Sequence, residues 1–149
     1  MTTQTPDFSG THGRFDALPP GGKAELRRVS SPKELRLTPA LYRLFPGARP
    51  TEQQLRLAFV LPWCERLRSG HGLGALCAGK IAEERIIQIA RANFPDDLIQ
   101  LRRVVMQLHA DVGWLEIAET LWFWGRNAKR RLVEDFYISL HKLDKEDKQ

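Results

Sequence analysis

Clusters of arginine and lysine are the side chains in this sequence best suited to bind a ligand, and phosphate is the ligand they suit. Arginine pairs bidentately with phosphate and stacks on nucleobases. No acidic residue lies three or four positions from Arg102 or Arg103, so no helical ion pair balances them. We interpret such clusters as nucleic-acid contacts, although each arginine alone is equally consistent with ordinary solvated surface. The adjacent cations are Arg27-Arg28, Arg102-Arg103 and Lys129-Arg130-Arg131.

Other kinds of site lack the residue patterns they need. The four histidines are scattered singly, and Cys64 and Cys77 form no CxxC pair, so no metal site is predicted. The glycine-rich residues 69–79 have neither the P-loop spacing nor the dinucleotide fingerprint. Cys77 and His109 could be imagined as nucleophile and base, but no motif brings them together. We therefore predict no enzyme activity, no catalytic residue and no cofactor, and two reduced cysteines that serve packing.

The composition agrees with a partner that carries negative charge. The 149 residues include 23 Lys+Arg and 18 Asp+Glu, a formal charge of +5 with a pI near 9.6, and arginine outnumbers lysine. This excess permits phosphate binding without demanding it, because charge also favours solubility. The first 22 residues have no apolar signal-peptide core, and no run of about 18 apolar residues occurs. We therefore predict a cytoplasmic protein with no membrane segment.

Helices are predicted to position these cations. Apolar residues recur at three- and four-residue spacing, and no stretch alternates as a strand would. Thr51 and Gln54 predict a capping box at the start of a helix over residues 51–67, and Pro62 predicts a kink or break within it. Asp111 is expected to cap a helix over residues 112–123. The predicted fold is an all-α compact bundle of two small lobes with about six to nine helices.

The chain divides by composition into five segments. The first is rich in Thr, Pro and Gly, and the last is mostly charged. The predicted segments are a mobile leader (1–22), an N-terminal helical lobe (23–69), a glycine-rich link (70–79), a C-terminal helical lobe (80–141) and a charged, solvated tail (142–149).

Residues 114–140 combine aromatic side chains with a basic run. Their aromatics recur at helical spacing, which is typical of core packing. The basic residues that follow fall in the first turns of a predicted helix and are weaker candidates for phosphate contact. We assign Trp122, Trp124, Leu132 and Phe136 to the core, and Arg126, Lys129, Arg130 and Arg131 to the surface.

Several motifs, in this order, resemble one known family. The sequence is similar to the CasB family, the small subunit of the type I-E CRISPR Cascade complex, over about residues 24–139. The motifs are LRRVS with Pro32 and ELR (26–36), PALYRL (39–44), GALCAG leading to ERI (74–86), LRR (101–103), LWFWG (121–125) and LVEDF (132–136).

The resemblance implies an all-helical, non-catalytic protein. It implies the other Cascade subunits as partners, including backbone and large subunits, and a second copy of the chain beside the first. It also implies contacts with crRNA-guided target DNA and with the displaced single strand of the R-loop, where base pairing by the guide supplies the specificity. No pattern of a base-reading helix occurs, so binding is predicted to be directed at the backbone. Through the matching motifs, the resemblance also implies that five arginines contact nucleic acid: Arg27, Arg28, Arg43, Arg102 and Arg103.

Two other functions remain open from the sequence. One is a structural adaptor whose apolar faces bind protein neighbours and whose charge is incidental. The other is a free-standing helical DNA-binding regulator. Steep salt dependence of binding would separate the first from a DNA-holding subunit, and a preference for one duplex sequence would identify the second.

Overall fold

The protein is helical throughout the part of the chain that the structure describes, residues 6–147. This computed structural model has nine α-helices and three 3-10 helices within that range, and the one β-bridge there, between Arg66 and Gly113, forms no strand. The predicted all-α class is confirmed. None of these helices has the length and apolar character needed to cross a bilayer. In chain order they are α1 (Phe8–Asp16), α2 (Pro20–Arg28), η1 (Pro32–Leu37), α3 (Pro39–Leu44), α4 (Glu52–Val60), η2 (Leu61–Trp63), α5 (Leu73–Cys77), α6 (Glu83–Arg91), α7 (Asp96–Leu108), η3 (His109–Asp111), α8 (Trp114–Trp122) and α9 (Arg126–Asp147).

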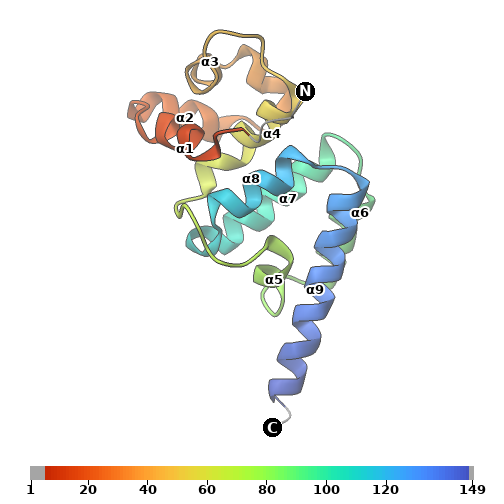
Figure 1. The fold of residues 1–149 in the computed structure, drawn as a ribbon. Coiled ribbons are helices and arrows are strands. Elements are labelled where there is room, and N and C mark those ends of the chain that lie inside the picture. The colour runs from red at the N-terminus through yellow and green to blue at the C-terminus, as the bar shows by residue number, and fades with distance from the viewer. Residues whose placement is uncertain (1–5, 148–149) are drawn as a thin grey trace, which may run out of the picture.

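One hydrophobic core runs through the molecule. Figure 1 shows α1–α4 gathered at one end, with α5–α9 forming the rest. The cluster of buried residues extends from Phe8 in α1 to Phe136 in α9, and α8 packs against both α1 and α4. The fully buried Trp114 ties the two ends together, since its Nε1 donates a hydrogen bond to the Phe8 carbonyl oxygen at 2.7 Å.

The predicted mobile leader is wrong for residues 8–22. The Asp7 side chain caps α1 by accepting a hydrogen bond from the Gly10 amide at 2.9 Å, and Phe8 and Phe15 are buried. Pro20 occupies the first turn of α2, where its fixed φ suits the helix and its missing N–H costs nothing. The glycines and prolines that suggested disorder therefore lie in or beside two helices. Residues 1–5 of the predicted leader lie outside the described residues.

Two features expected around α4 are present. The capping box of Thr51 and Gln54 forms, with both reciprocal hydrogen bonds. The α-helix then ends at Val60, and Pro62 lies in the 3-10 turn that follows. The predicted break is confirmed, and the helix is shorter than the 51–67 expected, because an inner proline removes a backbone donor and crowds the preceding turn.

The glycine-rich segment forms a short helix packed against α9. Leu73 is buried, and so is Cys77, which was predicted to serve packing. A Cβ at Gly74 would lie 2.7 Å from the Leu132 carbonyl oxygen and 2.7 Å from the Asp135 Cβ. Glycine is therefore needed here for close approach of two helices rather than for a phosphate loop.

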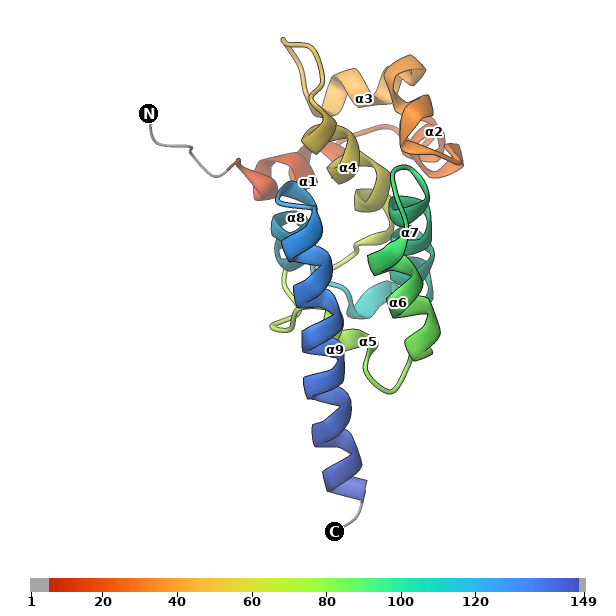
Figure 2. The same ribbon diagram turned by 90° about the vertical axis from the view of Figure 1, so that its right-hand side faces the viewer.

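The C-terminal helices differ from prediction at two points. Asp111 does not cap α8, which begins at Trp114 after Gly113. The Asp111 carboxylate instead pairs with the Lys80 Nζ at 3.1 Å. The tail predicted for residues 142–149 continues α9 as an exposed helix to Asp147, and residues 148–149 lie outside the described range. Figure 2 shows this end of α9 projecting beyond the body.

Candidate nucleic-acid interface

The structure sorts the nine predicted contact residues into two groups. Seven have exposed side chains, and no carboxylate within residues 6–147 lies within ion-pair distance of them. The other two, Arg102 and Lys129, are partly buried and bind acceptors inside the protein. The seven exposed residues are Arg27, Arg28, Arg43, Arg103, Arg126, Arg130 and Arg131.

Two of the predicted clusters lie next to each other. The Arg102 Nη1 donates a hydrogen bond to the Val29 carbonyl oxygen at 2.6 Å, across 73 positions of sequence. Val29 directly follows Arg27 and Arg28 in the last turn of α2, and Arg103 directly follows Arg102 on α7. One contact thus joins the end of α2, which carries Arg27 and Arg28, to the middle of α7, which carries Arg103.

Arg102 itself serves the fold. Its guanidinium lies 3.9 Å from the ring centroid of Phe59, which is fully buried in α4. Burial lowers the pKa of Arg102, and the nearby Arg103 charge lowers it further. Its Nε is buried without a hydrogen-bond partner among the described residues. Arg102 was predicted to contact nucleic acid, but its side chain already joins α2, α4 and α7.

Arg103 faces a different environment on the same helix. It lines a cavity of about 200 Å³ between α6 and α7, together with Arg85, Gln88 and Gln100. The cavity walls contribute two cations and two amides and no carboxylate. Phosphate oxygens accept hydrogen bonds from both kinds of group, so this wall suits a phosphodiester.

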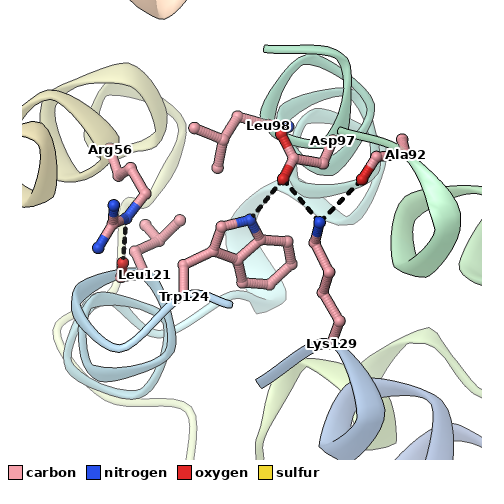
Figure 3. Close-up of polar contacts among 7 residues, drawn as sticks. All are labelled: Arg56, Ala92, Asp97, Leu98, Leu121, Trp124 and Lys129. Atoms are coloured by element: carbon pink, nitrogen blue, oxygen red, sulfur yellow. Dashed lines mark hydrogen bonds and ion pairs between the residues drawn. The ribbon is translucent and has the colours of Figure 1, made fainter. Parts of the chain in front are cut away.

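Lys129 is a structural residue at the start of α9. Its ammonium lies 2.9 Å from the Asp97 Oδ2 and donates to the Ala92 carbonyl oxygen at 2.8 Å. The Trp124 Nε1 donates to the same carboxylate oxygen at 2.9 Å, as Figure 3 shows. Asp97 is 3% exposed. These bonds fasten the junction of α8 and α9 to the beginning of α7.

Arg126, Arg130 and Arg131 of α9 are exposed, and Arg131 has acidic neighbours. Arg131 lines a cavity of about 380 Å³ whose wall also carries Glu116, Glu119 and Asp135. This wall bears more negative than positive side chains, so it suits a phosphate less well than the α6–α7 cavity. Arg43 stands apart from both cavities, exposed in the last turn of α3.

The aromatic residues assigned to the core fall into two classes. Leu132 and Phe136 are buried. Trp122 and Trp124 are partly buried and pack against the core. The Trp124 indole N–H, the one polar group of this side chain, is paired with the Asp97 carboxylate.

Sequence reasoning missed two residues that shape this surface. Arg56 donates from Nε to the Leu121 carbonyl oxygen at 2.6 Å, as Figure 3 shows. It also donates from Nη2 to the Trp122 carbonyl oxygen at 2.8 Å, and the two bonds close the end of α8. Burial lowers its pKa. Phe94, 54% exposed, follows α6. An isolated arginine and an isolated phenylalanine have no sequence pattern that would have identified them.

The groups capable of nucleophilic or metal chemistry are dispersed in the described residues. Both cysteines are free and buried, and burial raises the pKa of Cys64 and of Cys77 to about 12. His109 lies beside Glu65 at 3.5 Å rather than beside Cys77. Within residues 6–147 no three His, Cys, Asp or Glu side chains form a set able to hold a metal ion.

Comparison with known proteins gives three consistent matches. The sequence profile of CRISPR-associated protein Cse2 matches residues 22–137. The CRISPR system Cascade subunit CasB of Escherichia coli (strain K12) is 34% identical over 153 residues, covering 91% of this chain and 96% of that relative. A chain in the crystal structure of E. coli Cascade bound to a PAM-containing dsDNA target has a TM-score of 0.83 and 32% identity, covering 93% of this chain and 99% of that one. The resemblance read from the ordered motifs is confirmed.

Proposed function

The chain belongs to the Cse2 family of CRISPR-associated proteins, and from this premise we propose that it is a non-catalytic small subunit of a type I-E Cascade complex. In that complex it holds the target and displaced DNA strands of the R-loop through contacts with phosphates that do not depend on sequence. Specificity comes from base pairing with the guide, so the subunit needs only charge and shape.

One observation carries this proposal. The Arg102–Val29 hydrogen bond places Arg28 and Arg103, which are exposed and without an ion-pair partner among the described residues, on neighbouring elements. Cations on helices that are already packed bind a phosphate backbone without any further ordering of the protein backbone, so that part of the entropy cost of binding is avoided. The proposed contacts are therefore Arg27, Arg28 and Arg103 first, and Arg43, Arg126, Arg130 and Arg131 second.

The proposed partners follow from the relatives. The similar chain in E. coli belongs to a Cascade complex bound to a dsDNA target. We propose that this chain likewise assembles with backbone and large Cascade subunits around crRNA-guided DNA, with a second copy of itself alongside. A non-catalytic role agrees with the raised pKa of both cysteine thiols, which keeps them protonated near neutral pH.

The experiment measures binding of the full chain to single-stranded DNA between about 50 and about 200 mM salt. The test variants are Arg28→Glu and Arg103→Glu. The control is Lys145→Glu, which makes the same charge change in the exposed last turn of α9, outside the proposed contacts. Each lost phosphate contact should reduce the slope of log K against log salt by about 0.7.

The expected result is weaker binding for both test variants, with helicity by circular dichroism unchanged and the control close to wild type. Wild-type binding that does not fall with salt would overturn the proposal. Equal effects of all three substitutions would also overturn it, because they would show that net charge, not these positions, determines affinity.

A further inference from the structure

Phe94 is an aromatic ring left outside the core. It lies between the end of α6 and the start of α7, is 54% exposed, and is absent from the apolar side chains that pack on the core. The surrounding loop is held in place. The Ala92 carbonyl oxygen accepts a hydrogen bond from Lys129, and the Asp97 amide donates to the Asn93 carbonyl oxygen at 3.1 Å. The ring is thus presented to solvent by a fixed piece of backbone.

Cations from another part of the chain surround this ring. The Lys33 Nζ in η1 lies 5.9 Å from the Phe94 ring centroid. The Arg36 Nη1 donates to the Pro50 carbonyl oxygen at 3.1 Å, and the Arg36 carbonyl oxygen accepts a hydrogen bond from the Tyr42 hydroxyl. The Pro50 bond fixes the Arg36 guanidinium, and Arg36 lines the same cavity as the ring, so its charge is positioned before any ligand arrives.

A cavity lies between the ring and these cations. Its volume is about 190 Å³, and its walls are Lys33, Arg36, Arg56, Glu52, Leu55 and Phe94. Three cations face one carboxylate, and Leu55 is a buried apolar residue. The cavity therefore combines an exposed aromatic face, an apolar surface and net positive charge.

We propose that Phe94, Lys33 and Arg36 form a subsite for one nucleotide of a single-stranded nucleic acid. The base stacks on the Phe94 ring, and its phosphate lies against Lys33 and Arg36. Base–aromatic stacking tolerates any sequence, because every base has a π face. This inference rests on the proposed function, and it adds a contact with bases to contacts that are otherwise made with phosphates.

The positive charge around the Phe94 ring favours a nucleotide over an apolar protein surface as the bound partner. Phe123 is a second exposed aromatic, at 64%, but the cavity beside it contains Glu116, Glu119 and Asp135 against one arginine. Phosphate would be repelled there and attracted at Phe94. Phe123 therefore offers a matched control of the same residue type and similar exposure.

The test uses the full chain and two strands of about 12 nucleotides, one with normal bases and one composed of abasic residues. Phe94→Leu keeps an apolar side chain but removes the π face, and Phe94→Trp keeps stacking. We expect Phe94→Leu to raise Kd for the normal strand about five-fold or more and to leave Kd for the abasic strand unchanged. Phe94→Trp should bind both strands as wild type does, and so should the control Phe123→Leu.

Each other outcome overturns the subsite. Unchanged binding of the normal strand by Phe94→Leu would mean that the ring stacks on no base, and the phosphate-holding function would still stand. Equal loss for both strands would show that the ring acts on the fold or the backbone. Normal DNA binding with failed assembly into the complex would assign the ring to a protein partner. Absence of any wild-type binding would remove the proposed function and the subsite together.

Discussion

Replacing Lys129 with alanine should destabilise the protein rather than remove a DNA contact. The side chains of Lys129 and Asp97 are 16% and 5% exposed, so both charges lie largely out of water. The substitution leaves the Asp97 carboxylate buried, with the Trp124 indole still donating to it. An uncompensated buried charge of this kind costs about 3–5 kcal/mol.

That loss is large for a domain of this size. Total unfolding free energies are about 5–15 kcal/mol, so Lys129→Ala would remove a substantial part of the stability. At 2–4 °C per kcal/mol, the midpoint of thermal unfolding should fall by about 6–20 °C. DNA affinity measured well below that midpoint should equal that of the wild type, because the ammonium is already bound to internal acceptors.

The assay is urea unfolding followed by circular dichroism. Arg130→Ala is the control, since Arg130 is the next residue in sequence and is exposed. Its unfolding free energy should change by less than about 0.5 kcal/mol. The double variant Asp97→Asn with Lys129→Met removes both charges and should be more stable than Lys129→Ala. If Lys129→Ala were as stable as Arg130→Ala and bound DNA more weakly, the assignment of Lys129 to the fold would be wrong.

Three further substitutions or measurements test other contacts. Arg102→Ala should lower the unfolding free energy by about 1.5–3 kcal/mol by removing the charged hydrogen bond between α7 and α2, and wild-type stability in urea would refute that role. Gly74→Ala should cost about 1–3 kcal/mol because its Cβ would meet the α9 backbone, whereas Gly125→Ala, with open space at its Cβ, should stay within about 0.5 kcal/mol. Cys64 and Cys77 should react slowly with a thiol reagent at about pH 8 and rapidly after unfolding, because burial raises the pKa of both thiols to about 12; fast labelling of the native chain would contradict this.

Short sequence motifs correctly predicted where α4 begins and where it ends. The capping box at Thr51 and the break at Pro62 depend on residues within one or two turns of each other, so the sequence contains all the information they need. The helical spacing of apolar residues predicted the all-α class, and the family resemblance, based on ordered motifs over most of the chain, predicted the relatives.

Features that depend on packing between distant segments were not predicted from local motifs. The leader was judged by its Thr, Pro and Gly content, but Phe8 and Phe15 of α1 are buried in a core to which later helices, α3 and α8 among them, contribute. Asp111 has the residue type of a helix cap, yet its partner is Lys80, which no local pattern indicates.

The Arg102-Arg103 pair explains why the surroundings of each cation were harder to predict than the fold class. Adjacent residues of an α-helix point about 100° apart, so two neighbouring arginines cannot share one environment. Arg102 turns toward Phe59 and Val29 in the interior, and Arg103 turns toward the cavity between α6 and α7. The sequence shows two equal charges, and the direction of each depends on helices that are distant in the chain.

The buried cations and the exposed ones have connected roles. Arg102 fixes α2 against α7, and Lys129 fixes the start of α9 and the Phe94 loop against α7. Each internal bond therefore sets the position of exposed groups beside it: Arg28 and Arg103 in the first case, and Phe94 in the second. Charges on such fixed elements lose little freedom when they meet a phosphate, which favours binding without new sequence-specific contacts. Under the proposed function, the basic side chains would contribute to DNA holding in two ways: exposed cations would contact the strand, and buried cations such as Arg102 and Lys129 keep the helices that carry them in place.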